Sequence, residues 1–228
     1  MLYDTKKSIK TIETVFDIVY LAIVLFFAIF LLSRDFSFTS PRWVFGLITL
    51  LLFLGDTSHL IPRISAMWSK DSKLEPFLGY GKMTTSISMT LFYLGLWYLG
   101  IITFEQNGLF ATKMTVVFLG FVLVRVVFCV LPQNKWKEDA ASFAWGIIRN
   151  IPLIIMGLFV ILQYIIGGAS LPIGNGSSFI WILLIISFAF YIPVLLFANK
   201  YPKVGMLMIP KSLAYVAIIF YGSFFFQN

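Results

Sequence analysis

Residues 12–32 read IETVFDIVYLAIVLFFAIFLL, an almost unbroken apolar run near the start of the chain. A helix of roughly 20 such residues spans the hydrocarbon core of a bilayer, which is roughly 30 Å thick. Similar runs recur along the chain, which is 60% hydrophobic and 12% charged, with a mean hydropathy of +0.93. A soluble domain has about twice that charged fraction. Because helices satisfy their own backbone hydrogen bonds in lipid, the sequence predicts an all-α, polytopic membrane protein.

The apolar runs predict a bundle of seven transmembrane helices. We expect one domain over residues 1–228, with spans near 12–32, 42–65, 82–104, 111–131, 140–167, 178–198 and 204–225. Lysines precede the first run, as they do in a signal peptide. However, the run is longer than a signal-peptide core, and Ser33-Arg34-Asp35 follows it in place of a small-residue cleavage site. We therefore expect the first run to stay in the protein as a span. The connections are short, so we expect no appended soluble domain.

Lysine and arginine residues are distributed unevenly between the two sides of the predicted bundle. The N-terminal segment and the second, fourth and sixth loops carry Lys6, Lys7, Lys10, Lys70, Lys73, Lys135, Lys137, Lys200 and Lys203. The opposite loops carry Arg34, Arg42 and Lys113. The positive-inside rule then predicts a cytoplasmic N-terminus and an external C-terminus. We expect anionic inner-leaflet headgroups as partners, no nucleic acid, and a plasma membrane, with the short loops favouring a bacterial one.

The second predicted span carries ionisable residues in GDTSHLIPRI, residues 55–64. At 100° per residue, Asp56, His59 and Arg63 lie at about 0°, 300° and 340° around a helix, on one narrow stripe. Other spans place polar residues at a similar depth, in the cytoplasmic half: Asp17, Lys82, Thr85, Ser86, Thr90, Tyr93, Arg125, Arg149, Asn150 and Lys211. One charge at the bilayer centre costs about 2.5–3.5 kcal/mol on insertion scales. Several at one depth are tolerable when they face one another or water, so we predict a polar cavity open to the cytoplasm.

The charges in this half do not balance. The deep acids are Asp17 and Asp56, whereas the deep cations are Arg63, Lys82, Arg125, Arg149 and Lys211. An unpaired buried cation is costly, and guanidinium groups bind carboxylates and phosphates at two points. We therefore expect a small anionic solute or a lipid headgroup, bound by Asp56, His59, Arg63, Lys82, Arg125, Arg149, Asn150 and Lys211. The alternatives are that Arg63 and Lys82 snorkel to the interface and that the charges form a structural ion network.

Short similarities between spans indicate a possible internal repeat. Leu60-Ile61-Pro62 in the second span resembles Tyr191-Ile192-Pro193 in the sixth. In the third span Lys82 precedes Phe92-Tyr93, and in the seventh span Lys211 precedes Phe220-Tyr221, at almost the same interval. Spans two and three thus echo spans six and seven, as in a 3+1+3 arrangement. Such a repeat would place Lys82 and Lys211 on opposite sides of one cavity.

The residues that bind metals and cofactors are scarce. His59 and Cys129 are the one histidine and the one cysteine of the chain, whereas catalytic zinc sites commonly use two or three histidines. A lysine in the seventh span is typical of retinal proteins, but the predicted third span contains no carboxylate that could act as the counter-ion. We expect no metal and no cofactor, and we expect Cys129 to be a small core residue.

Three classes of function fit these patterns. The first is a transporter or carrier for a small anionic solute or lipid. The second is an intramembrane enzyme that acts on a lipid or lipid-linked phosphate, with Asp56 and His59 as an acid–base pair and the arginines on the phosphate. The third is a receptor or accessory subunit whose polar network is purely structural. We rank them in this order, since the sequence contains no catalytic signature with its flanking context.

Overall fold

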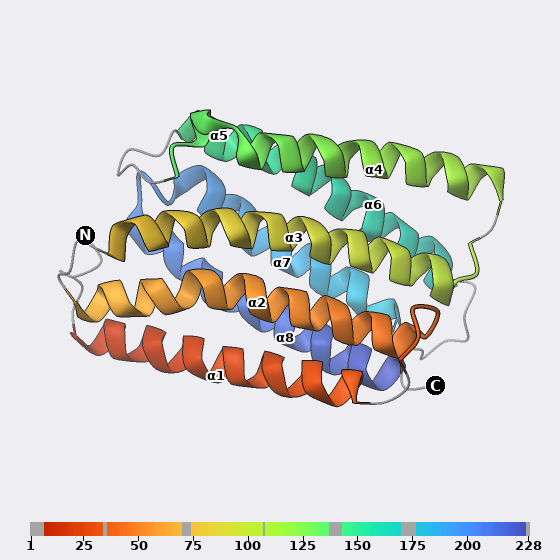
Figure 1. Cartoon of the computed structure of the whole chain (residues 1–228), viewed down its shortest axis with the longest axis horizontal. Helices are drawn as coiled ribbons and strands as arrows, with labels where there is room; N and C mark the ends of the chain where they lie inside the picture. Colours follow the sequence, from red (N-terminus) through yellow and green to blue (C-terminus); the bar gives the residue numbers. More distant parts are fainter. Residues whose placement is uncertain are drawn as a thin grey trace.

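The computed structural model describes residues 7–33, 36–69, 74–106, 108–136, 143–169 and 177–226, and the elements in these ranges are helical (Figure 1). They are α1 (Lys7–Leu32), α2 (Pro41–Trp68), α3 (Glu75–Thr103), α4 (Leu109–Val130), α5 (Phe143–Ile148), α6 (Asn150–Ala169), α7 (Ser177–Phe197) and α8 (Met208–Phe225). Two short 3-10 segments, η2 (Pro132–Asn134) and η3 (Pro202–Leu207), precede α5 and α8.

Seven segments of the described chain are long and apolar enough to cross a membrane, which agrees with the predicted helical membrane bundle. Six of them are built on the single long helices α1, α2, α3, α4, α7 and α8, and α5 and α6 together form the remaining one. The orientation of the termini and the internal repeat stay predictions.

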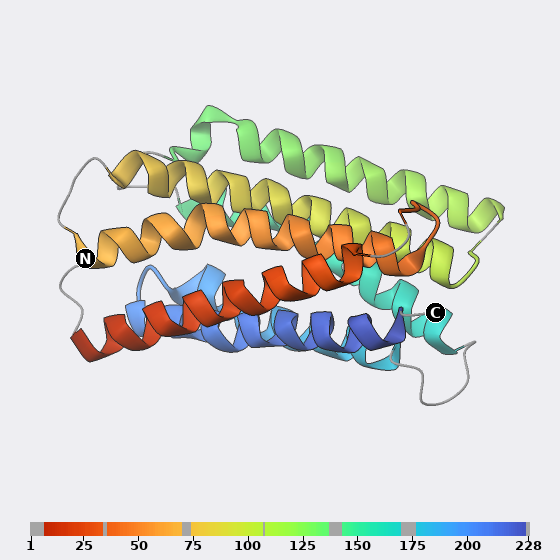
Figure 2. The same ribbon diagram turned by 60° about the horizontal axis from the view of Figure 1, so that its bottom comes forward.

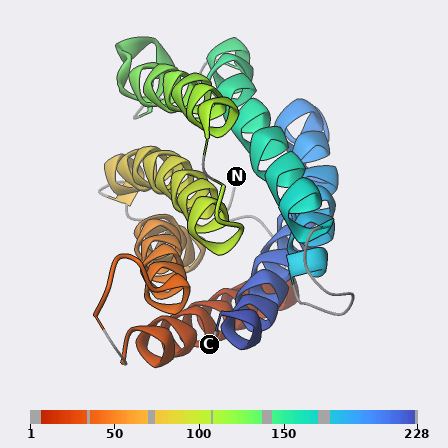
Figure 3. The ribbon, with the colours of Figure 1, turned by 90° about the vertical axis from the view of Figure 1, so that its right-hand side faces the viewer.

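The helices form a ring in which neighbours along the chain also pack together. Each helix contacts the next, from α1 to α4, then α4 to α6, α6 to α7 and α7 to α8, and α8 returns to α1. Seen end-on, α1 to α4 form one side and α6 to α8 the other (Figure 3). A turned view shows α1 running beside α8 (Figure 2). We call the end where α1 begins the N-terminal end and the end where α8 finishes the C-terminal end.

The pair α2 and α3 is held at short range by small residues. Hydroxyl groups of α3 donate to carbonyl oxygens of α2, from Thr85 to Gly55 at 2.7 Å and from Ser88 to Leu51 at 2.5 Å. A Cβ on Gly81 would collide with the carbonyl oxygen of Ser58. Pro62 lies four residues after Ser58 and has no N–H to donate, so this carbonyl lacks its usual helical donor. Gly81 lets α3 approach α2 at that point.

The predicted fifth span, residues 140–167, agrees with the candidate span Phe143–Ala169, but the structure adds an interruption within it. Residues 140–142 lie outside the described residues, and the rest divides into α5 and α6 with a turn at Arg149. Pro152 is the physical reason, because proline removes the donor for the carbonyl of Ile148, the last residue of α5. The Nδ2 atom of Asn150 donates to the carbonyl of Gly146 at 2.7 Å and so stabilises the interruption.

Several predicted spans began too late. α1 starts at Lys7 and not near residue 12, and α3 starts at Glu75 and not near residue 82. The hydropathy pattern marks where the chain becomes apolar, whereas a helix continues through polar residues at its ends. As a result, Glu13 lies within α1, and Lys82 lies about two turns inside α3.

Substitution of Gly81 tests the close approach of α2 and α3. We expect Gly81→Ala to lower the free energy of unfolding by about 1–3 kcal/mol, because the methyl group has to push the Ser58 carbonyl away. Gly120→Ala in α4 is the matched control, since a Cβ there meets nothing within 4 Å, and alanine favours a helix over glycine. Denaturation in detergent micelles measures both. Equal stability of the two variants would contradict the proposed contact.

Candidate functional site

A cavity of about 210 Å³ lies among α2, α3, α4, α6, α7 and α8, in the half of the bundle nearer its N-terminal end. Five basic side chains line it, one from each of five separate segments: His59, Lys82, Arg125, Arg149 and Lys211. Among the described residues that line it, none is an aspartate or a glutamate. Hydroxyl groups from Ser86, Ser187 and three tyrosines complete its polar wall.

Lys211 is positioned by two of these tyrosines. Its Nζ atom lies 5.0 Å from the ring centroid of Tyr191 on α7 and 5.2 Å from that of Tyr215, one turn further along α8. The hydroxyl groups of Tyr215 and Tyr93 are 3.4 Å apart, which extends the polar wall to α3. Aromatic faces attract an ammonium group but leave its N–H donors unused, so Lys211 can still bind an anion.

Arg125 and Arg149 meet where α4 faces the interruption between α5 and α6. The Nη1 atom of Arg125, whose residue is 1% exposed, donates to the backbone carbonyl of Arg149. The Nη1 atom of Arg149 donates to the Oδ1 atom of Asn134 at 3.0 Å, and its guanidinium lies 4.1 Å from the ring centroid of Trp136. Each guanidinium is thus fixed through one nitrogen while its charge remains unneutralised by these contacts.

Both guanidinium groups have N–H donors that form no hydrogen bond. In both Arg125 and Arg149 the Nε atom is buried without a hydrogen-bond partner. Every hydrogen bond that they donate to a described residue uses Nη1, and neither forms an ion pair within the described part of the chain. The Nε side of a guanidinium forms a two-point fork that matches the oxygens of a carboxylate or a phosphate. The pair is therefore suited to an oxyanion.

Asn134 is a residue of this site that the sequence analysis missed. It is fully buried in η2, where its Nδ2 atom donates to the carbonyl oxygens of Phe128 at 2.6 Å and Leu131 at 2.9 Å. These bonds cap the end of α4 and aim the Oδ1 atom at Arg149. An asparagine two residues after a proline at the end of a span was the available signal for such a cap. Trp136, Tyr191 and Tyr215 were also missed, because aromatic residues are common throughout the chain.

Arg63 was expected at the cavity and lies elsewhere. It faces α1, where its Nη2 atom is 2.9 Å from the carboxylate of Glu13 and its Nη1 atom is 3.8 Å from that of Asp17. Glu13, which lies within the predicted first span, was not among the deep acids expected from the sequence. The count of two acids against five cations is corrected accordingly: Arg63 has its own acidic partners, and the excess of cations belongs to the cavity.

The expected pair of Asp56 and His59 is separated in the structure. Asp56 turns toward α1, where its Oδ2 atom accepts a hydrogen bond from the hydroxyl of Tyr20 at 2.5 Å. His59 turns toward the cavity, and its Nδ1 atom is buried without a partner. The difference of about 60° between them on a helix is enough to point them at different neighbours. Among the described residues, no hydrogen bond joins the two side chains.

Asn150 supports the cavity without lining it. Its Oδ1 atom accepts a hydrogen bond from the Tyr191 hydroxyl at 2.8 Å, so it orients one of the rings that flank Lys211.

Cys129 is buried in α4 and its carbonyl accepts from the Trp136 indole at 2.9 Å. Among the described residues, no three His, Cys, Asp or Glu side chains gather so that they could hold a metal ion.

Comparison of the chain with known protein families, with curated proteins and with solved structures finds no match.

The contact between Arg63 and Glu13 can be tested by a double-mutant cycle. We expect Arg63→Gln to destabilise the protein because it leaves Glu13 and Asp17 without their cation, and Glu13→Gln to destabilise it because Arg63 keeps only the more distant Asp17. The double variant should lose less than the sum of the two, with a coupling of about 0.5–3 kcal/mol. Unfolding in detergent micelles gives the four values. Strictly additive losses would show that the pair contributes nothing.

Proposed function

We propose that the protein is an integral membrane carrier that binds a small oxyanion, a carboxylate or phosphate of a solute or of a lipid headgroup, in the basic cavity. One observation carries the proposal. Five basic side chains from five segments converge on one cavity whose described lining contains no carboxylate. Charged groups inside a membrane protein usually pair or face a pathway, and Arg125 and Arg149 form no ion pair within the described part of the chain.

The energetic argument concerns Arg125 and Arg149 most directly. Leaving a buried charge uncompensated costs several kcal/mol, and two guanidinium groups side by side also repel each other. An oxyanion between them removes both costs and satisfies the unused Nε donors. Lys211 and His59 line the same cavity and add positive or polar contacts on its other side.

The distribution of basic residues supports a cavity on the cytoplasmic side. The described residues Lys135, Lys200 and Lys203 lie in connections at the N-terminal end, whereas Arg42 and Lys113 lie near the other end. Lys6, Lys70, Lys73, Lys137 and Arg34, which also entered the count, lie outside the described residues. The positive-inside rule places the N-terminal end, and with it the cavity, toward the cytoplasm. We propose a bacterial plasma membrane as its location.

Two prolines near the cavity favour a carrier over a static binding protein. Pro62 lies within α2, three residues after His59, and Pro193 lies within α7, two residues after Tyr191. Proline removes a helical hydrogen bond and is a common cause of bends in helices. Both helices therefore have a weak point beside residues that line the cavity.

A second candidate function is an intramembrane enzyme that acts on a lipid phosphate. The observation in its favour is that the Nδ1 atom of His59 is unpartnered in the same cavity as the two arginines. In this alternative, His59 acts as the proton-transfer group and the arginines hold the phosphate. Asp56 would then have a supporting role, since it accepts a hydrogen bond from the Tyr20 hydroxyl.

Binding of an oxyanion is tested by removal of either guanidinium. Inorganic phosphate, acetate and dioleoyl phosphatidic acid serve as probes in isothermal titration calorimetry. We expect Arg125→Gln and Arg149→Gln each to weaken binding of the preferred probe about 10- to 100-fold, the value of a charge-assisted hydrogen bond. Arg149→Lys should weaken it as well, because lysine keeps the charge and lacks the fork.

Arg42→Gln is the matched control, because Arg42 lies at the opposite end and contacts Phe30. It should leave binding unchanged. If none of the probes binds the wild-type protein and the arginine variants only lower its stability, the network is structural and the proposal fails.

His59→Gln separates the carrier from the enzyme. For a carrier, phosphate or phosphatidic acid should still bind, and any movement of the bound probe across proteoliposomes should change less than about tenfold. For an enzyme, binding should persist while hydrolysis of phosphatidic acid falls about 10²- to 10⁴-fold, the usual contribution of a general acid or base. Measured phosphatase activity in the wild-type protein that His59→Gln abolishes would replace the carrier proposal with the enzyme.

A further inference from the structure

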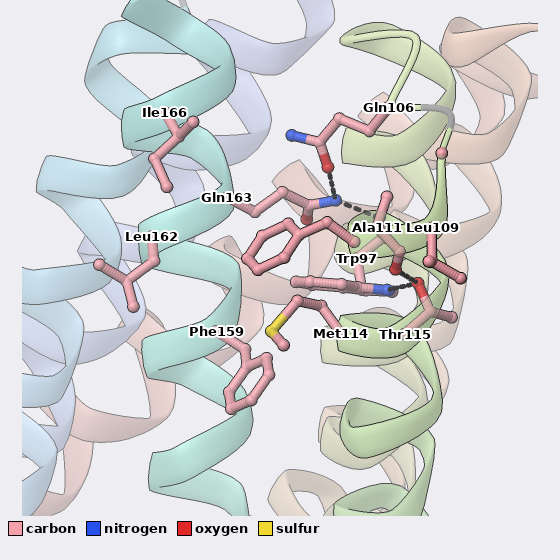
Figure 4. Close-up of a pocket in the computed structure, with 12 residues that line it drawn as sticks. Trp97, Gln106, Leu109, Ala111, Met114, Thr115, Phe159, Leu162, Gln163 and Ile166 are labelled. Atoms are coloured by element: carbon pink, nitrogen blue, oxygen red, sulfur yellow. Dashed lines mark hydrogen bonds between the residues drawn. The ribbon is translucent and has the colours of Figure 1, made fainter.

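A second and larger cavity, of about 540 Å³, lies near the C-terminal end, where α3 finishes, α4 begins and α6 finishes (Figure 4). Its size is within the range of about 300–1,000 Å³ that is typical of small-molecule sites. The connection between α3 and α4 closes one side, and Gly108 there has φ of +132°, which a residue with a side chain rarely adopts. We call this cavity the apolar pocket.

Several apolar side chains of this pocket are exposed on the outside of the bundle. Leu109, Phe110, Leu162 and Ile166 line it, and each of these residues is more than half exposed in the isolated bundle. No charged side chain is among the described residues that line it. A molecule can therefore enter sideways from the hydrocarbon region, and the lining suits an uncharged, largely apolar occupant.

Polar groups are few in this pocket, and they are concentrated on Gln163. This residue lies on α6 and is only 4% exposed. Its Nε2 atom donates to the Trp97 carbonyl and to the Oε1 atom of Gln106, both at 3.1 Å. Figure 4 shows Gln163 extending from α6 toward Gln106 and Trp97 on the facing segments. A carbonyl oxygen can only accept, so the amide nitrogen must face Trp97 and the orientation of the carboxamide is fixed.

The remaining hydrogen-bonding capacity of Gln163 is that of an acceptor. Both hydrogens of Nε2 are used, whereas the Oε1 atom is buried without a partner. Elsewhere on the wall, the Trp97 indole donates to Thr115 and Thr115 donates to the Ala111 carbonyl, and the Oε1 atom of Gln106 is used by Gln163. A buried carbonyl oxygen without a donor costs about 1–3 kcal/mol. The occupant that removes this cost must bring a hydrogen-bond donor.

We propose that the apolar pocket binds an uncharged membrane lipid that carries a hydroxyl group on its polar end, with the hydroxyl donating to the Oε1 atom of Gln163. An ammonium group could also donate, but its charge would be buried without a counter-charge in an apolar wall. The acyl chain of the lipid lies against Phe159, Leu162 and Ile166. The affinity then depends on the donor, whereas the tail contributes through burial of apolar surface.

This site is separate from the basic cavity. Trp97 of the pocket wall stacks on Phe118 with centroids 4.7 Å apart, and Phe159 contacts both rings. Phe118 is fully buried and lies between Thr115 and Arg125 along α4. The aromatic layer Trp97–Phe118–Phe159 thus stands between the apolar pocket and the half of the bundle that contains Arg125. The proposal does not rest on anion binding.

The test compares two probes that differ in their donors. Nanodiscs of phosphatidylcholine that contain the protein are titrated with the 9,10-dibromostearoyl ester of glycerol, which has hydroxyl groups, or with the methyl ester of the same acid, which has none. Bromine quenches tryptophan fluorescence, and the part of the quenching that Trp97→Phe removes reports on the pocket. We expect the glycerol ester to reach half-quenching at a mole fraction about three- to tenfold lower than the methyl ester.

Gln163→Leu should abolish this preference while the methyl ester still binds. Gly100→Ala provides a second route to the same result, because its methyl group would lie 2.5 Å from the Cδ and Oε1 atoms of Gln163 and displace them. It keeps the proposal testable if Gln163→Leu does not fold. Gly120→Ala, where a Cβ meets nothing within 4 Å, should keep the preference. Equal affinities for the two probes in the wild-type protein, or a preference that survives both Gln163→Leu and Gly100→Ala, would overturn the proposal.

Discussion

A guanidinium group that is buried away from water needs hydrogen-bond acceptors from the protein, and Arg125 is such a group at the centre of the bundle. Arg125 sits on α4 amid apolar residues and is almost fully buried. Its partner is the backbone carbonyl of Arg149, which lies at the turn between α5 and α6. Asn134 and Trp136 then fix the side chain of Arg149. The position of α5 and η2 against α4 and α6 follows from this one buried charge.

The charged residues inside the bundle have two different kinds of neighbours. Between α1 and α2, Arg63 pairs with Glu13 and Asp17, and Asp56 accepts a hydrogen bond from the neutral hydroxyl of Tyr20. Around the basic cavity, the described lining contributes cations, hydroxyl groups and aromatic faces but no carboxylate. Arg63 has acidic partners, whereas Arg125 and Arg149 form no ion pair within the described part of the chain, and this contrast supports the proposed anion site. Acidic partners are therefore present beside Arg63 and absent from the described lining of the basic cavity.

The two ends of the bundle have opposite chemical character. The basic cavity offers donors and positive charge, whereas the apolar pocket offers one unsatisfied acceptor in a hydrocarbon-like wall. The stacked rings of Trp97, Phe118 and Phe159 fill the space between them with closely packed apolar surface. Under the two proposals, the basic cavity binds an oxyanion and the apolar pocket binds a neutral lipid that carries a hydrogen-bond donor.

The sequence by itself determined the architecture, because a segment of about 20 apolar residues has no stable state in lipid other than a helix. It also predicted a cluster of charges in one half of the bundle, and five of the eight expected residues, namely His59, Lys82, Arg125, Arg149 and Lys211, line one cavity. Tertiary structure alone decided the partners. Asp56, His59 and Arg63 share one stripe on α2, yet that stripe borders α1 on one side and the cavity on the other, so a rotation of about 60° separates a structural carboxylate from a cavity histidine. Periodicity gives the angle of a residue around its own helix; which neighbour occupies that angle depends on how all the helices pack.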